Sequence, residues 1–259
     1  MTDKTSQAGG DSAPANTPVP SLSQRPVTVG RRGPETILSI GTGATQSAAL
    51  LDDPSILSLA YTRFMMLACV LAPRLGSVLH IGLGGGTMVR FLQACFPGIR
   101  QLAIEINPEV VKAAYRDFRL DTVPGLEVLT GDAIALLPSI DERFDMVFLD
   151  AFDNDKTPAG LITQDMLQEI GRHLNADGWL AANVYAGNLS LRALHRRWRA
   201  AFPQVLQVRE EPLFWPIVFA TGQDEPVNFV DLGARARELE ECMPLPLAFM
   251  TSGLVPVGG

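Results

Sequence analysis

Short apolar runs alternate with segments of helical hydrophobic spacing through the middle of the chain. The first run, at residues 77–81, ends in a cluster of glycines, and apolar residues then recur at helical spacing from Met88 to Cys95. Strands that alternate with helices predict a mostly parallel sheet with helices on both faces, a doubly wound α/β fold. In such a sheet the ligand lies beyond the carboxyl ends of the strands. Strands are predicted at residues 77–81, 102–106, 126–129, 146–149 and 179–184, each followed by a helix.

The pattern on either side of this core is less regular. Glycine-broken apolar pieces at residues 36–53 predict a strand hairpin, and residues 56–72 predict a helix with a broad buried face. Residues 205–221 predict two antiparallel strands, and residues 229–242 predict a last helix. We expect four units: a disordered tail at 1–33, a small strand, hairpin and helix unit at 34–76, the α/β domain at 77–243, and a C-terminal tail at 244–259.

Composition narrows the class of protein. The net charge of −7 over 259 residues argues against a general nucleic-acid binder, which would carry basic clusters. The three cysteines are scattered without a CxxC motif or a nearby histidine, so we expect neither a disulfide framework nor a metal site. No apolar run reaches the ~18 residues that a membrane span needs, and the polar N-terminus lacks the apolar core of a signal peptide. We therefore expect a cytoplasmic protein that does not bind membranes.

The glycine cluster after the first strand is a candidate ligand-binding turn. It consists of Gly82, Gly84, Gly85 and Gly86, directly before a predicted helix. Glycine permits positive φ and lets a ligand lie on the backbone, while the N–H groups that begin the helix face that ligand. A tight turn without a ligand is the alternative, because a glycine-rich turn alone is a weak signal.

Acidic residues stand at the ends of the next two strands. Glu105 lies ~20 positions beyond the glycine turn, where a carboxylate suits the two hydroxyls of a ribose. Asp132 can accept a hydrogen bond from an adenine amino group, or it can cap the following helix. In either case the backbone N–H of Ala133 can meet the adenine ring. These residues indicate an adenosine, shared by NAD and S-adenosyl compounds, and do not identify a reaction.

The fourth and fifth strands end in the candidate reacting groups. The strand at 146–149 is followed by Asp150 and then Asp153, and carboxylates delivered by a buried strand are typical of a reacting centre. A solvated acidic loop is the alternative. Asn183, at the end of the fifth strand, either binds substrate or holds a neighbouring loop. No Ser-His-Asp or Cys-His arrangement is visible, so nucleophilic catalysis is not supported.

Together these motifs resemble the spermidine synthase family, polyamine aminopropyltransferases with the Rossmann-like fold of class I methyltransferases. The resemblance runs from about Gln46 to Pro216 and rests on the order and spacing of IGLGGG, IEINP, GDA, LDAFD with LIT after it, and DGWLAANV. It implies decarboxylated S-adenosylmethionine as the donor and a small cationic amine as the acceptor. A homodimer is one option for the assembly, which the sequence does not decide.

The resemblance also implies roles for single residues. Glu105 matches the acid that holds the donor's ribose, and Asp132 matches the aspartate that reads the adenine amino group. Asp150 matches the catalytic aspartate, and Asp153 matches the carboxylate that helps to hold the polyamine. Gln46 resembles a glutamine that lines the donor pocket.

Other positions match or depart from the family near the acceptor and the donor's tail. Tyr61 resembles the tyrosine that orients the acceptor amine. Trp215 stands where the family has a tyrosine before a proline, so the ring is kept and the hydroxyl is lost. Gly85 stands where the family carries an aspartate that binds the donor's aminopropyl ammonium.

These departures leave alternatives open. A methyltransferase that uses intact S-adenosylmethionine on a small substrate is favoured by Gly85, and a non-catalytic nucleotide-binding relative is favoured by Trp215. A nicotinamide dehydrogenase is the weakest reading, because Thr87 stands where its motif needs glycine. For aminopropyl transfer, an amine must lose a proton and attack in line with the leaving sulfur, and Asp150 is the candidate general base.

Overall fold

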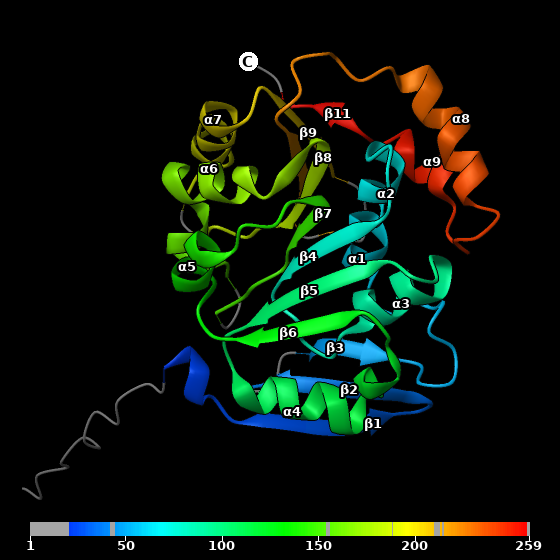
Figure 1. The fold of residues 1–259 in the computed structure, drawn as a ribbon, viewed down its shortest axis with the longest axis vertical. Coiled ribbons are helices and arrows are strands. Elements are labelled where there is room, and N and C mark those ends of the chain that lie inside the picture. The colour runs from blue at the N-terminus through cyan, green and yellow to red at the C-terminus, as the bar shows by residue number, and fades with distance from the viewer. Residues whose placement is uncertain are drawn as a thin grey trace, which may run out of the picture.

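A mostly parallel sheet forms the centre of the molecule. The computed structural model describes residues 21–41, 45–153, 156–187, 189–209, 213 and 215–257. The strands of the large sheet are β4 (Ser77–Ile81), β5 (Arg100–Glu105), β6 (Leu126–Thr130), β7 (Phe144–Leu149), β8 (Leu174–Asn183), β9 (Gln204–Val208), β10 (Ile217–Thr221) and β11 (Val255–Pro256). In the described part of the chain this sheet has eight strands in the order β11-β9-β10-β8-β7-β4-β5-β6 (Figure 1).

The direction of the strands confirms the predicted doubly wound fold. Strands β8, β7, β4, β5 and β6 run parallel to one another, and β10, β9 and β11 add an antiparallel edge. The chain passes from β4 through β5 to β6 at one edge, and then returns to place β7 on the other side of β4. The switch point therefore lies between β4 and β7, which is where ligands bind in open α/β sheets.

Helices cover both faces of this sheet. The α-helices are α1 (Ala60–Met65), α2 (Leu67–Leu71), α3 (Thr87–Cys95), α4 (Pro108–Asp117), α5 (Ala133–Leu136), α6 (Gln164–Arg172), α7 (Leu191–Ala201), α8 (Phe229–Leu239) and α9 (Leu247–Thr251). Short 3₁₀ helices are η1 (Leu22–Gln24), η2 (Leu120–Thr122), η3 (Leu137–Ser139) and η4 (Ala159–Ile162). In the described residues, no helix is both long enough and apolar enough for a membrane span.

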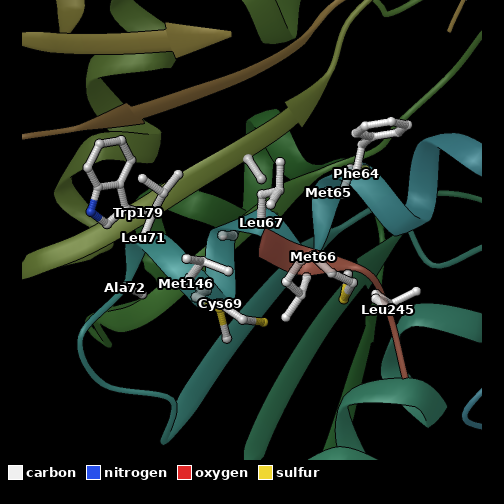
Figure 2. Close-up of a cluster of buried hydrophobic side chains, with 14 of the residues drawn as sticks. Phe64, Met65, Met66, Leu67, Cys69, Leu71, Ala72, Met146, Trp179 and Leu245 are labelled. Carbon is white, nitrogen blue, oxygen red and sulfur yellow. The ribbon is translucent and has the colours of Figure 1, made fainter. Parts of the chain in front are cut away.

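Alternating side chains divide the core between the two faces. Met146 and Phe148 of β7 join the cluster under α1, α2, α3, α8 and α9, whereas Val147 and Leu149 join the cluster under α6 and α7. This is the period of two that a strand imposes. Figure 2 shows buried side chains of the α1–α2 segment gathered with Met146 and with Trp179 of β8. Both faces being apolar explains why β7 reads as a continuous hydrophobic run.

A second, three-stranded antiparallel sheet stands beside the pocket region. It consists of β1 (Val27–Arg32), β2 (Glu35–Ile40) and β3 (Thr45–Ala49), in the order β1-β2-β3. The predicted hairpin at 36–53 corresponds to β2 and β3. The predicted disorder of residues 1–33 is wrong for β1, because Val27 and Val29 pack against buried residues of β2 and α4. Residues 1–20 lie outside the described part of the chain.

Two other boundaries differ from the sequence prediction. The helix predicted at 56–72 begins only at Ala60, because Asp53 accepts hydrogen bonds from the backbone N–H and hydroxyl of Ser55 and holds a turn there. The tail predicted at 244–259 is instead part of the α/β domain. Leu247 and Met250 of α9 are buried, and β11 pairs with β9. This pairing joins residues almost fifty positions apart, so no local pattern indicates it.

Candidate active site

The glycine turn meets the loop after β7 at the switch point. This loop, residues 150–153, is predicted from the sequence to be catalytic and is here called the catalytic loop. Gly82 follows β4, and Asp150 follows the neighbouring β7, where its backbone N–H donates to the carbonyl of Ile81 at 2.9 Å. Gly82 has a φ of +96°, and a Cβ there would lie 2.3 Å from the carbonyl oxygen of Asp150. Only glycine allows the two strand ends to approach this closely. The glycine turn therefore lies directly beside Asp150, the candidate reacting group.

A pocket of about 150 Å³ opens at this point. Its walls come from the carboxyl ends of β4, β5, β6 and β7, from β3, and from α1. Eight of the predicted site residues line it: Gln46, Tyr61, Gly82, Gly84, Glu105, Asp132, Ala133 and Asp150. The structure therefore brings together most of the site that the sequence indicates.

Glu105 is fixed by backbone groups at one end of the pocket, here called the donor end. It is 8% exposed, and its carboxylate accepts from the backbone N–H of Leu83 at 3.0 Å and of Asn107 at 2.9 Å. Burial raises the pKa of Glu105, and the backbone hydrogen bonds oppose that rise. The carboxylate thus stands on the pocket wall in a fixed orientation, as a ribose-binding acid requires.

Asp132 and Ala133 lie on the same wall. Asp132 caps α5 by accepting from the backbone N–H of Ile134 at 2.9 Å, and it also lines the pocket. Ala133 is buried behind it. Asp132 therefore caps α5. Its contact with an adenine amino group stays a prediction, which its place on the pocket wall permits.

The later glycines of the turn do not line the pocket, which corrects the sequence prediction. The backbone N–H of Gly85 donates to the hydroxyl of Ser47 at 2.8 Å. A Cβ at Gly85 would lie 2.7 Å from the ring of Phe118, and one at Gly86 would lie 2.5 Å from Leu120. A side chain at position 85 therefore points toward Phe118, at the end of α4. Both glycines serve close packing of the turn.

At the other end of the pocket, here called the acceptor end, side chains hold Asp150 from two directions. The Tyr61 hydroxyl donates to Oδ2 of Asp150 at 3.0 Å, and Nδ2 of Asn183 donates to Oδ1 at 3.0 Å. Burial raises the pKa of Asp150 to about 6, while these two hydrogen bonds lower it. Burial, and then the charge of Asp150, raises the pKa of Tyr61 well above its ordinary value, so Tyr61 stays a proton donor.

Trp215, a candidate substrate-binding residue, hydrogen-bonds to Asn183. Its indole N–H donates to Oδ1 of Asn183 at 2.6 Å, and neither residue is among those that line the pocket. An amide whose oxygen accepts from Trp215 must turn its NH₂ group toward Asp150. Asn183 therefore holds the catalytic loop, one of the two roles that the sequence left open.

Asp153 is the other predicted substrate residue that the structure places elsewhere. It does not line the pocket, and its Oδ1 lies 2.5 Å from a guanidinium nitrogen of Arg25. Arg25 falls inside the segment that sequence analysis assigned to disorder. The alternation of Val27 and Val29 with polar residues, just after Arg25, is the signal that could have revealed an ordered strand there.

Ser47 and Phe152 are among the pocket residues that sequence analysis did not assign to the site. Ser47 of β3 lines the pocket and binds the glycine turn, and Phe152 lies between the two aspartates of the catalytic loop. Nothing in the hairpin's local pattern indicates that β3 covers a ligand site. Phe152 could have been considered, because it stands between two candidate site residues, Asp150 and Asp153.

Comparisons with known proteins agree with this geometry. Residues 78–178 match a family model described as a methyltransferase domain. A polyamine aminopropyltransferase of Neisseria meningitidis is 28% identical over 221 residues, which cover 84% of this chain and 84% of that protein. The structure of a probable spermidine synthase from Corynebacterium glutamicum has a TM-score of 0.71 at 20% identity, and the match covers 92% of this chain and 95% of that one. The chain has the spermidine synthase-like fold.

A methyltransferase also shares the central part of this fold. Human methyltransferase-like protein 13, solved in complex with SAH, has a TM-score of 0.66 at 22% identity, and the match covers 73% of this chain and 94% of that one. The similar proteins are transferases, in agreement with the predicted class of enzyme. In the spermidine synthase-like fold of this chain, the β1–β3 sheet adds Gln46 and Ser47 to the pocket wall.

Proposed function

We propose that the protein transfers an aminopropyl group from decarboxylated S-adenosylmethionine to a small amine. The observation that carries this proposal is the state of Asp150, a half-buried carboxylate that lines the pocket and accepts hydrogen bonds from Tyr61 and Asn183. The similarity to polyamine aminopropyltransferases supports aminopropyl transfer over methyl transfer. Under this proposal Asp150 is the catalytic residue and Tyr61 orients the attacking amine.

The donor end of the pocket fits the adenosine part of such a donor. Glu105 presents a fixed carboxylate to the two ribose hydroxyls, which can both donate to it. Ile104, Ile106 and Ile134 also line the pocket and offer apolar surface against which an adenine ring can pack. The residues present therefore suit an S-adenosyl compound.

Asp150 is suited to the proton transfer that the reaction needs. An aliphatic ammonium has a pKa of ~10, so the amine arrives protonated and must release a proton before its lone pair can attack. The nitrogen then forms a bond to the carbon beside the sulfonium, the carbon–sulfur bond breaks, and its electron pair leaves on sulfur as a neutral thioether. A carboxylate with a pKa of about 6 is ionised at pH 7 and is a stronger base than an exposed aspartate.

Methyl transfer from intact S-adenosylmethionine is the second candidate. Gly85 favours this candidate, because glycine lacks the carboxylate that the resemblance expects at this position for the donor's aminopropyl ammonium. A side chain at position 85 would also point toward Phe118. Among the described residues of the pocket wall, the carboxylates are Glu105, Asp132 and Asp150. The similarity to a methyltransferase solved with SAH also supports this candidate.

Product analysis separates the two candidates. The purified protein would be incubated with either decarboxylated or intact S-adenosylmethionine and a panel of amines. We expect methylthioadenosine and an aminopropylated amine from the decarboxylated donor. S-adenosylhomocysteine from the intact donor, with no methylthioadenosine from the other, would contradict the proposal and support methyl transfer.

A further inference from the structure

The carboxylate predicted to hold a polyamine already has a cationic partner within the protein. Arg25 approaches Asp153 to 2.5 Å, and the Arg25 side chain is only 9% exposed. The backbone carbonyl of Arg25 accepts from Nδ2 of Asn107 at 3.0 Å, and Asn107 caps α4 directly after Glu105. The ion pair is therefore built into the border of the active site and is not a chance contact between exposed side chains.

Arg25 also lies close enough to influence a bound substrate. It lines a small cavity of about 30 Å³ together with Gln46, Glu105 and Phe152, all of which line the main pocket as well. Figure 1 shows the segment before β1, in dark blue, on the side of the molecule to which the arrowheads of β5 and β6 point. A positive charge from the N-terminal segment therefore borders the same end of the sheet as the catalytic loop.

This pair changes which acceptors the site suits. A linear diamine carries two ammonium groups at neutral pH, because each has a pKa of ~10. Asp150 can bind the reacting nitrogen, but a second ammonium placed near Asp153 meets a carboxylate that is already neutralised by Arg25. The Asp153 side chain is 36% exposed, and two cations beside one carboxylate repel each other, so a second ammonium gains less there than beside a free carboxylate. The described part of the site therefore holds one ammonium well and a second one poorly.

The surface next to Asp150 is aromatic. Phe152 lines the pocket, and its ring centroid lies 6.1 Å from that of Trp215. Trp215 in turn stacks on Tyr185 at 4.8 Å, and Tyr185 is 38% exposed. Phe152, Trp215 and Tyr185 thus form a row of neighbouring rings, here called the aromatic wall, that begins in the pocket and ends at a partly exposed side chain. An apolar chain or ring can pack against such a row.

We propose that the acceptor is an amine with a single ammonium group and an uncharged, apolar or aromatic body that packs along Phe152, Trp215 and Tyr185. This inference rests on the proposed function and narrows its substrate class. Asp150 binds the reacting nitrogen, and the body of the amine packs against the aromatic wall. The Arg25–Asp153 pair disfavours an acceptor with a second cation.

The test compares amines of matched length with decarboxylated S-adenosylmethionine as the donor. The kcat/KM for methylthioadenosine release would be measured with 1,4-diaminobutane, butylamine and 4-phenylbutylamine. We expect 4-phenylbutylamine to be used at least tenfold better than 1,4-diaminobutane, with butylamine between them. A preference for the diamine would overturn the proposal. This holds also if the preference disappears in Asp155→Asn, a variant included because Asp155 lies outside the described residues.

Variants of the ion pair test the cause of the preference. Arg25→Ala frees the carboxylate of Asp153, so we expect the kcat/KM ratio to move toward the diamine by at least tenfold. The double variant Arg25→Ala with Asp153→Asn should lose that gain, and Arg31→Ala, on the exposed face of β1, is the matched control. Arg25→Gln serves if Arg25→Ala does not fold. An unchanged ratio in the arginine variants, or a gain that survives in the double variant, would refute the role of the ion pair.

The outcome also distinguishes this inference from the proposed function. Methylthioadenosine release with a diamine preference leaves aminopropyl transfer intact and overturns only the acceptor class. If the decarboxylated donor yields no methylthioadenosine with any amine, the proposed function fails and this inference fails with it.

Discussion

The two ends of the pocket are built in different ways. At the donor end, Glu105 is held by two backbone N–H groups. One belongs to Leu83, just after the neighbouring strand β4, and the other belongs to Asn107, two residues after Glu105. At the acceptor end, Asp150 is held by side chains of Tyr61 and Asn183, and a third side chain, from Trp215, orients Asn183. These three partners come from α1, from the end of β8 and from the segment before β10.

This difference indicates which part of the site can change most easily. A site made by backbone groups follows from the fold and stays in place when surface residues are substituted. A site made by a chain of side chains depends on each member, because losing one leaves buried polar groups without partners. We therefore expect nucleotide binding to be robust and acceptor chemistry to be sensitive to single substitutions.

The largest expected effect is at Asp150. Its substitution should abolish most of the transfer activity of the acceptor end without changing nucleotide binding at the donor end. Asp150→Asn keeps the size of the side chain but removes its charge and its ability to accept the proton. We expect the transfer rate to fall by a factor of order 10²–10⁴, the usual contribution of a general base. Affinity for methylthioadenosine, measured by calorimetry, should not change, because Glu105 carries that contact. Asp165→Asn, on an exposed turn of α6, is the control, and near-normal turnover in Asp150→Asn would falsify the assigned mechanism.

The corresponding substitution at the donor end is Glu105→Ala. Loss of a carboxylate that accepts from a ribose diol should weaken methylthioadenosine binding by ~1.5–3 kcal/mol, or roughly 10–150-fold. The N–H groups of Leu83 and Asn107 would also lose their acceptor, so a lower melting temperature is expected as well. Glu109→Ala, in an exposed pair with Lys112, is the control. Unchanged affinity in calorimetry would mean that the nucleotide lies elsewhere.

A third substitution tests whether the glycine turn is packed as tightly as the structure indicates. Gly85→Ala places a Cβ at 2.7 Å from Phe118, and overpacking of this kind costs about 1–3 kcal/mol of the free energy of unfolding. In Gly30→Ala the added Cβ has no neighbour within 4 Å, so this matched variant should unfold at the urea concentration of the unmodified protein. Equal unfolding curves for all three proteins would contradict the orientation assigned to position 85.

The smallest expected effect is a change in pH dependence at the acceptor end. The proposed mechanism needs ionised Asp150, so we expect kcat/KM to fall as the pH drops below about 6. The hydrogen bond from Asn183 lowers the pKa of Asp150, so Asn183→Ala should raise that pKa and move the acid limb upward by roughly one pH unit. Trp215→Phe should move it in the same direction by less. An acid limb that stays in place in both variants would show that Asn183 does not act on Asp150.

The sequence by itself indicated the doubly wound sheet, the succession of its strands along the chain, and the glycines and carboxylates at the strand ends. Apolar runs, glycines and acidic residues at fixed spacing indicate a parallel sheet, because each of these signals is local and the carboxyl ends of parallel strands meet at one edge. The positions of Gly82, Glu105 and Asp150 follow from that rule without knowledge of any side-chain contact.

Only the tertiary structure decided how the remaining residues act. Gly85 points toward Phe118, Trp215 binds Asn183, and Arg25 neutralises Asp153. Each of these contacts joins residues more than thirty positions apart, and the direction of a side chain at such a contact depends on how separate elements pack. Hydrophobic periodicity records which face of an element is buried and carries no information about which distant partner meets it.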